Sequence, residues 1–251
     1  MKLLFDIGNT RLRAAWSSAD GLRPIASVVH VDAKLPEVLA ALKLSERPAE
    51  IWVASVAAAP TGQSVLNWAR EKFDLAAHLL VSSRECCGVK NSYADPSRLG
   101  VDRWLAIIAA HHRALSSGGG PACVVSAGTA VTFDMVDENG QHLGGLIAPG
   151  VGSQRRYLLG ATGMVRPQAE IAGLDWLGSS TEQALAYGTA HSVLGLIERA
   201  SSAAARKHPT MRWLISGGEA ESLLPHLPSH WEHAPLLVFE GLARVAAGGS
   251  S

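Results

Sequence analysis

The chain contains two similar stretches, DIGNT at residues 6–10 and SAGTA at residues 126–130, which lie 120 residues apart. In each, an apolar run leads into a short polar turn with Gly at its third position, and a second run follows. A glycine-containing turn then ends each pair of runs, at residues 20–21 and 139–140. The spacing is close to half of the 251 residues, so it predicts two related lobes that each begin strand–turn–strand. A chance likeness of two hairpins is the alternative.

The stretch SSGGGP at residues 116–121 is the clear break in composition and separates the two copies. Gly and Pro cannot continue the preceding helix, so the stretch indicates a turn or a linker. We therefore expect two domains, residues 1–117 and residues 118–251.

Apolar periodicity and turn residues predict the remaining elements. In the first half we expect strands at 3–5, 11–16, 51–56 and 79–81, and helices at 36–44, 61–73 and 101–115. In the second half we expect strands at 122–125, 132–136, 142–147 and 213–215, and helices at 181–205, 219–224 and 239–247. The adjacent histidines His111 and His112 are expected on a helix surface. These elements indicate an α/β protein.

Composition excludes several classes of protein. Apolar residues make up 47% of the chain and charged residues 18%, so it can bury a core and is not disordered. Lys and Arg number 22, as do Asp and Glu, and this balance argues against a nucleic-acid binder and an electrostatic membrane anchor. A local site for a small anion remains possible.

The cysteines and the N-terminal residues bear on the compartment. Cys86, Cys87 and Cys123 are too few for a disulfide framework, and no zinc-ligand spacing occurs. Charged residues at positions 6, 11 and 13 interrupt any signal-peptide core, and no apolar run approaches the ~20 residues that span a bilayer. We expect a soluble, cytoplasmic protein with reduced thiols.

The turn at residues 6–10 has the composition of a phosphate-binding turn. Gly8 lets the backbone approach a ligand closely, and successive N–H groups can surround phosphate oxygens. Asn9 and Thr10 add side-chain donors, and Asp6 can hold Mg²⁺ directly or through water. An ordinary hairpin turn is the alternative.

Gly128 and Thr129 repeat this arrangement in the second half, with the same alternative. Together the two turns could hold the polyphosphate of a nucleotide from both sides. Neither a P-loop nor a GxGxxG motif is present, so such a phosphate site would be of another kind.

The stretch GVDRW at residues 100–104 opens a predicted helix. Asp102 could orient a substrate hydroxyl and accept its proton late in phosphoryl transfer, where positioning matters more than basicity. Arg103 offers a planar fork for a carboxylate or phosphate. The alternatives are a helix cap for Asp102, a surface ion pair for Arg103 and a half-buried loop aromatic for Tyr93.

Four motifs in order resemble the type III pantothenate kinases of the acetate and sugar kinase/Hsp70/actin superfamily: DIGNT (6–10), GVDRW (100–104), GTA (128–130) and GGLIAPG (144–150). The likeness runs from residue 3 to about residue 245. It implies an α/β fold of two ribonuclease-H-like lobes, the actin-like ATPase fold, with a nucleotide cleft between them. It also implies transfer of the ATP γ-phosphate to the hydroxyl of pantothenate, the first step of coenzyme A synthesis.

The resemblance assigns roles by position, with Asp102 as the proton acceptor. ATP would be bound by Asp6, Ile7, Gly8, Asn9, Thr10, Arg11, Leu12, Arg13 and Thr129, and Asp6 would hold Mg²⁺ through water. Pantothenate would be bound by Tyr93, Gly100, Val101, Asp102, Arg103 and Thr181. Members of this family are homodimers, so Thr181 would reach the neighbouring subunit's site. A helix N-cap is the alternative for Thr181.

One position departs from the family. Its members usually carry Asp before the second turn, where it binds a monovalent cation (K⁺ or NH₄⁺), whereas this chain has Ser126. A hydroxyl supplies no charge, so the sequence predicts weak or absent potassium dependence.

Other functions and two smaller assignments stay open. A nucleotide-binding regulator without catalysis is one, since some relatives were first described as accessory factors for transcription; the presence of Asp6 and Asp102 argues against it. A related kinase for another hydroxylated substrate is a second, and residues 100–103 argue against it. WLISGG at 213–218 suits either an adenosine-side turn or a plain strand-to-helix turn. Arg155 and Arg156 suit either anionic ligand groups or a partner's acids.

Overall fold

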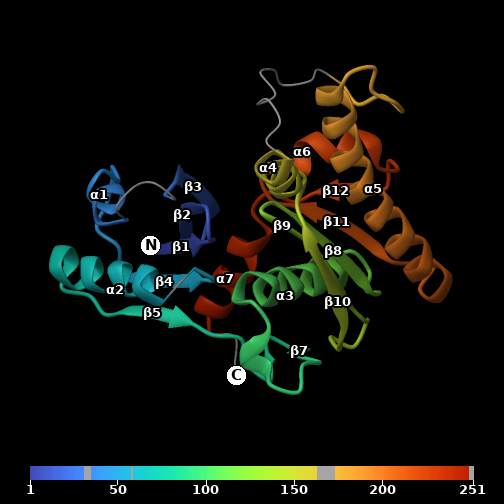
Figure 1. The fold of residues 1–251 in the computed structure, drawn as a ribbon. Helices are drawn as coiled ribbons and strands as arrows, with labels where there is room; N and C mark the ends of the chain where they lie inside the picture. The colour runs from blue at the N-terminus through green and yellow to red at the C-terminus, as the bar shows by residue number, and fades with distance from the viewer. Residues whose placement is uncertain (31–34, 58, 163–172, 249–251) are drawn as a thin grey trace.

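The computed structural model describes residues 1–30, 35–57, 59–162 and 173–248, and its ribbon shows two five-stranded sheets side by side (Figure 1). The first sheet has the order β3-β2-β1-β4-β5 and the second has the order β10-β9-β8-β11-β12. Their strands are β1 (Lys2–Ile7), β2 (Arg11–Ser18), β3 (Gly21–Val29), β4 (Glu50–Ser55), β5 (Ala77–Leu80), β8 (Ala122–Ala127), β9 (Ala130–Val136), β10 (His142–Pro149), β11 (Arg212–Ser216) and β12 (Trp231–His233).

The two sheets repeat one topology. In each, the first three strands form an antiparallel meander, and the last two run parallel to the first strand. The strands that open the two halves, β1 and β8, begin 120 residues apart. The internal repeat expected from the sequence is therefore confirmed. Both strands are central and almost entirely buried, which explains their continuous apolar runs.

Most helices of the described chain lie beside a single sheet (Figure 1). In the first half these are α1 (Leu35–Ala40) and α2 (Ala59–Phe73), and in the second half α4 (Val151–Thr162), α5 (Thr181–Lys207) and α6 (Ala220–Leu223). Short elements complete the described chain: the hairpin of β6 (Glu85–Cys86) and β7 (Val89–Lys90), and the turns η1 (Pro96–Arg98) and η2 (Leu224–His226).

Two helices, α3 (Val101–Ser116) and α7 (Leu237–Ala246), lie against each other between the sheets (Figure 1). Although α3 precedes the glycine-rich break, it packs mainly on β8 and β9, whereas α7 from the chain's end packs on β1 and β4. One apolar cluster accordingly includes Leu4 of β1, Leu105 of α3 and Val124 of β8. The division of the chain at residues 117/118 thus stays a prediction. Each half contributes one helix that packs on the sheet of the other half.

The structure differs from the sequence-based expectations at several elements. The helix expected at 36–44 ends at Ala40, and β3, β12 and α4 were not expected. His111 is buried rather than on a helix surface, and burial lowers its pKa. The reason is that α3 is enclosed on nearly all sides along residues 103–111, so the side chain of His111 is buried, whereas that of His112 is half-buried.

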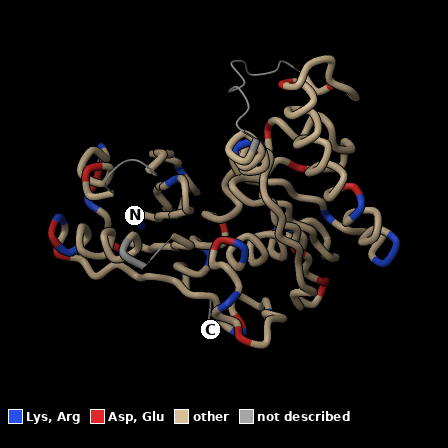
Figure 2. Tube along the Cα trace, in the orientation of Figure 1, with Lys and Arg blue, Asp and Glu red and all other residues tan. Residues whose placement is uncertain are grey.

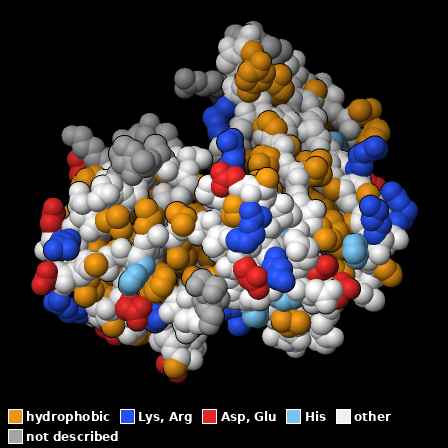
Figure 3. Space-filling view, turned by 90° about the horizontal axis from the view of Figure 1, so that it is seen from below, with side chains coloured by type: hydrophobic (Ala, Val, Ile, Leu, Met, Phe, Trp, Pro, Cys, Tyr) orange, Lys and Arg blue, Asp and Glu red, His pale blue; other side chains and the backbone are white. Residues whose placement is uncertain are grey.

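The surface carries charges of both signs. Figure 2 shows acidic and basic residues scattered over both halves, and Figure 3 shows small hydrophobic groups separated by charged and polar side chains on the lower face. In the part of the chain that the structure describes, no helix is long and apolar enough to cross a membrane.

The contact between α3 and α7 depends on a glycine. A Cβ on Gly241 would lie 2.1 Å from the carbonyl oxygen of Leu105, so Gly241→Ala should push the helices apart and lower the free energy of unfolding by about 1–3 kcal/mol. The control is Gly195→Ala in α5, where nothing lies within 4 Å and the gain should be roughly 0.5–1 kcal/mol. Urea unfolding measures both, and equal stability of the two variants would contradict this account.

Candidate active site

The two glycine turns of the repeat meet. The hydroxyl oxygens of Thr10 and Thr129 are 2.9 Å apart and share a hydrogen bond between the two halves of the chain. Each turn is closed in the same way, since the amides of Gly8 and Gly128 donate to a backbone carbonyl two or three residues further on, at 2.9 and 3.0 Å. The facing arrangement expected from the repeat is therefore present.

Two further glycines let other segments pack against the second turn. A Cβ on Gly150 would lie 1.8 Å from the carbonyl oxygen of Gly128, and one on Gly217 would lie 2.1 Å from that of Ala127. Gly217 also has φ +98°, which disfavours any other residue. The motif GGLIAPG and the turn after β11 thus both abut the second glycine turn.

Glu219 follows the turn after β11 and connects this turn to α4. Its carboxylate accepts hydrogen bonds from the amides of Val151 and Gly152 at 3.1 and 2.9 Å, where the start of a helix favours negative charge. Arg155 of α4 donates instead to Thr189 of α5 at 3.0 Å, and Arg156 donates to Ser153. Both contacts lie within this chain, and they leave open whether either arginine serves a ligand or a partner's acid.

A partly buried ion pair precedes the first turn. Asp6 ends β1 and accepts a 2.9 Å hydrogen bond from Nε of Arg13, with a second contact from Nη2. The guanidinium of Arg13 also lies 5.7 Å from the ring centre of Phe239 in α7. Ile7 and Leu12 are fully buried, so only their backbone could contact ATP.

Asn9 and Arg11 are exposed beside this turn. Arg11 is 3.4 Å from the hydroxyl of Ser27 on β3. Their side chains therefore face solvent at the point where the two turns meet.

Asp102 stands in the first turn of α3. Its Oδ1 accepts a 2.7 Å hydrogen bond from the amide of Arg103, and a Cβ on Gly100 would come within 2.7 Å of the same oxygen. Burial raises the pKa of the Asp102 carboxyl, and the charge of nearby Asp6 raises it further, while the Arg103 amide and guanidinium act in the opposite direction. A carboxyl perturbed in this way suits proton transfer.

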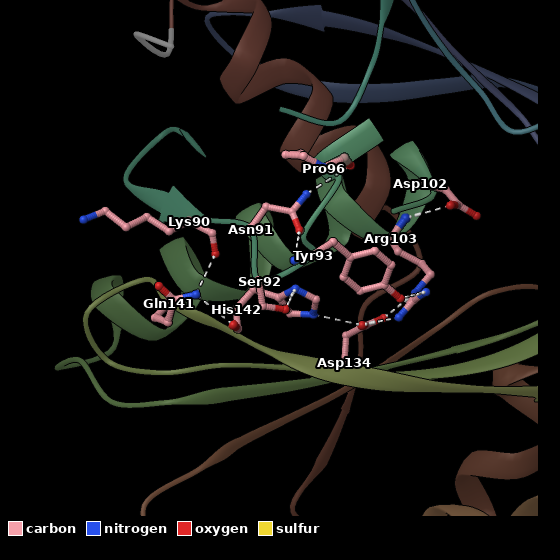
Figure 4. Close-up of polar contacts among 10 residues, drawn as sticks. All are labelled: Lys90, Asn91, Ser92, Tyr93, Pro96, Asp102, Arg103, Asp134, Gln141 and His142. Carbon is pink, nitrogen blue, oxygen red and sulfur yellow. Dashed lines mark hydrogen bonds and ion pairs between the residues drawn. The ribbon is translucent and has the colours of Figure 1, made fainter. Parts of the chain in front are cut away.

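Arg103 is buried and its fork is occupied. Its Nε and Nη2 donate to the two oxygens of Asp134 at 2.8 and 2.6 Å, and its Nη1 donates to the Tyr93 hydroxyl at 3.1 Å (Figure 4). Burial lowers the pKa of Arg103, but the hydrogen bond and charge of Asp134 outweigh it and the pKa is raised. The surface ion pair considered for Arg103 is wrong, because this ion pair lies inside the protein.

Three residues of this region were missed in the sequence: Ser92, Asp134 and His142. Asp134 had a signal, since it is an acidic residue within the otherwise apolar run of β9. Ser92 and His142 had none, because they lie 50 residues apart and come together only in the fold.

Three other predicted positions lie apart from this cluster or within the core. Val101 is buried, so its side chain belongs to the core. Thr181 is the exposed first residue of α5, whose N-cap is Ser180, so the cap alternative for Thr181 is wrong. Among the described residues, no hydrogen bond joins Thr181 to the cluster. Ser126 lies on β8 in register with Thr132 and Ser216 on the flanking strands.

The raised pKa of Asp102 has a consequence for stability. Its ionised form is disfavoured in the folded protein relative to the unfolded chain, and this penalty is fully present above the folded-state pKa. Asp102→Asn should therefore raise the free energy of unfolding, with a gain that shrinks as the pH falls from about 8 toward about 4. Urea unfolding across this range measures the gain; a destabilised variant, or a gain independent of pH, would contradict the prediction.

Comparison with solved structures supports the fold. A Campylobacter jejuni protein, assigned provisionally to the Baf family of transcriptional activators, matches with a TM-score of 0.59 at 20% identity over 98% of this chain and 97% of that one. The ethanolamine utilization protein EutJ from Carboxydothermus hydrogenoformans matches with a TM-score of 0.53 at 14% identity over 96% and 88%. The predicted fold class, two ribonuclease-H-like lobes of the actin-like ATPase type, is confirmed.

Comparison of sequences identifies the family. The chain is 33% identical to the type III pantothenate kinase of Nitrosococcus oceani over 98% of its own length and 94% of that protein's. It is 37% identical to the type III pantothenate kinase of Xanthomonas campestris pv. campestris over 97% and 96%. The family model for type III pantothenate kinase matches residues 2–203. This chain therefore belongs to the type III pantothenate kinase family.

Proposed function

We propose that the protein transfers the γ-phosphate of ATP to the hydroxyl of pantothenate and forms 4′-phosphopantothenate, the first step of coenzyme A biosynthesis. Family membership supports the reaction. The observation that carries it is the position of Asp102 in the first turn of α3: burial raises the pKa of its carboxyl, and so does the charge of nearby Asp6, which lies near the end of β1 and before the first glycine turn. A proton acceptor thus lies close to the turns that would bind phosphate.

ATP would lie between the two turns, with Thr10 and Thr129 as its hydroxyl donors. Their mutual hydrogen bond brings the two turns together, which supports a ligand held from both sides. A bound polyphosphate would replace that hydrogen bond with donation to phosphate oxygens. The backbone of each glycine turn would add N–H donors.

Pantothenate would lie on the other side of Asp102, against Tyr93, Gly100 and Arg103. Asp102 would orient the substrate hydroxyl and accept its proton as the phosphoryl group transfers. Its burial favours this task, because the desolvated carboxylate binds a proton more readily than a carboxylate in water. Since such a transition state is largely dissociative, holding the hydroxyl in line contributes more than basic strength.

Mg²⁺ would be held by Asp6 through water. In the described residues, no group of three or more His, Cys, Asp or Glu side chains comes together as a metal site, and Asp6 already accepts from Arg13. One carboxylate that acts through water fits Mg²⁺, because this ion keeps several waters and takes its other ligands from substrate phosphates. The ion would supply charge neutralisation at the phosphates.

We also place the protein in the cytoplasm as a homodimer in which Thr181 contributes to the neighbouring subunit's site. The edge strand β10 exposes Leu143, Leu146 and Ile147, and α4 exposes Tyr157, which supports an apolar contact between copies. The three cysteines are free thiols, which supports a reducing compartment.

Asp102→Asn should lower turnover of pantothenate with Mg²⁺-ATP by at least about 100-fold, because the amide cannot accept the proton. Asp20→Asn in an exposed turn is the matched control and should behave as the wild type. Coupled measurement of ADP release, with sugars as competing acceptors, tests the proposal. A wild-type protein that leaves pantothenate unphosphorylated, or prefers a sugar, would refute it.

Potassium should have little effect on turnover. The position of the family's cation-binding Asp carries Ser126, and its neighbours in register, Thr132 and Ser216, are also uncharged hydroxyls. The buried hydroxyl of Thr132 has no hydrogen-bond partner among the described residues, but a neutral oxygen does not offset the charge of a cation. Assays in potassium and in tetramethylammonium at equal ionic strength measure the effect, and a large potassium requirement would contradict the prediction.

A further inference from the structure

A continuous chain of hydrogen bonds runs from Ser92 to Tyr93 (Figure 4). We call it the Arg103 network, and its members are Ser92, His142, Asp134, Arg103 and Tyr93. Ser92 Oγ is 3.0 Å from Nδ1 of His142, and Nε2 of His142 is 3.2 Å from Oδ1 of Asp134. Asp134 binds the fork of Arg103, which in turn reaches the Tyr93 hydroxyl. The side chains of His142, Asp134 and Arg103 are 0%, 3% and 6% exposed.

The direction of each hydrogen bond follows from the groups involved. Arginine only donates and a carboxylate only accepts, so Asp134 must receive the Arg103 bonds and also the His142 bond. Nε2 of His142 therefore carries a hydrogen. The other ring nitrogen, Nδ1, lies 3.0 Å from the Ser92 hydroxyl, which can donate to it.

The same directions fix the hydroxyl of Tyr93. Its oxygen accepts the 3.1 Å bond from Nη1 of Arg103, so its own hydrogen points elsewhere and is free to be donated. The ring is held as well, because it stacks on His142 at 6.0 Å with an interplanar angle of 24° and lies 5.9 Å from the Arg103 guanidinium. Tyr93 is thus a half-buried donor that the network orients.

The strand β10 closes the other side of the ion pair. A Cβ on Gly145 would lie 2.1 Å from Oδ1 of Asp134 and 2.6 Å from Nη2 of Arg103. No ligand can reach the Asp134 face of the guanidinium without displacing this backbone. Nε and Nη2 of Arg103, which the sequence analysis considered for a substrate anion, are therefore bound to Asp134 inside the protein. Only Nη1, on the Tyr93 side, remains available to a ligand.

We propose that Asp134 and His142 are positioning residues for the acceptor substrate: they hold Arg103 so that its Nη1 and the Tyr93 hydroxyl form a pair of donors for the substrate's carboxylate. This inference rests on the proposed function, because it takes pantothenate as the acceptor. Asp134 neutralises the arginine, so the two donors recognise the carboxylate by direction rather than by net charge. His142 fills the remaining acceptor position of Asp134 and supports the Tyr93 ring.

The first test is Asp134→Asn, which removes the charge that holds the Arg103 fork. The KM for pantothenate should rise by at least about tenfold, while kcat and the KM for ATP stay nearly unchanged, because the loss falls on one charge-assisted contact to the acceptor. Pantothenyl alcohol carries CH₂OH in place of the carboxylate, so its KM should rise far less than that of pantothenate when Asp134 is replaced. An equal penalty for both acceptors, or an unchanged KM for pantothenate, would overturn the proposal.

The second test uses His142 and does not depend on whether Asp134→Asn folds. In His142→Gln the amide nitrogen can still donate to Asp134, so most of the affinity for pantothenate should return, whereas His142→Leu should reproduce the raised KM. Ser92→Ala, at an exposed position, should give a smaller rise of the same kind. Identical KM values for His142→Gln and His142→Leu would show that the site is only structural and would overturn the proposal.

Different results would contradict the positioning proposal and the proposed function. If the wild type phosphorylates pantothenate and these variants show no selective rise in its KM, the positioning proposal alone is wrong. If the wild type does not act on pantothenate, the proposed function is wrong and the positioning proposal falls with it. Titration calorimetry with pantothenate alone gives a check that does not involve ATP: wild type should bind and Asp134→Asn should bind at least about tenfold more weakly.

Discussion

The burial of α3 between the two sheets is the constraint on which the site depends. Its first turn carries Asp102 and Arg103, and the following residues, 104–110, are all apolar and buried. Packing against α7, β8 and β9 therefore fixes both the rotation and the height of the helix. Because protein interiors are close-packed, a shift of α3 would disturb this whole shared core. The site residues thus inherit their positions from apolar contacts far from the chemistry.

Charge pairing distinguishes the three acidic groups of the site. Asp6 is paired with Arg13 and Asp134 with Arg103, both at close range. Among the described residues, Asp102 takes part in no ion pair, and burial together with the charges of Asp6 and Asp134 raises its pKa. Similar carboxylates acquire different tasks from their surroundings: two hold arginines in place, and under the proposed function the third would accept the proton.

Sequence reasoning succeeded where the signal was local. The glycine turns and the apolar runs around them predicted the repeat, and with it the strands that open both sheets. The motif at residues 100–104 located the start of α3. What it missed depends on pairing between distant parts of the chain: Asp134 and His142 acquire meaning only once β9 and β10 lie over α3. The error at His111 has the same origin, because a helix pattern alone does not reveal a neighbour on every side.

The exchange of helices between the halves also bears on how such a chain is put together. The helix α3, which precedes the glycine-rich break, packs mainly on the second sheet, and α7, which follows β12, packs on the first. A single half would leave the inner face of its sheet bare, so neither half forms a complete folding unit. The segment SSGGGP then connects two halves that pack on each other's sheets, and the first sheet acquires α7 only after the second sheet has been synthesised.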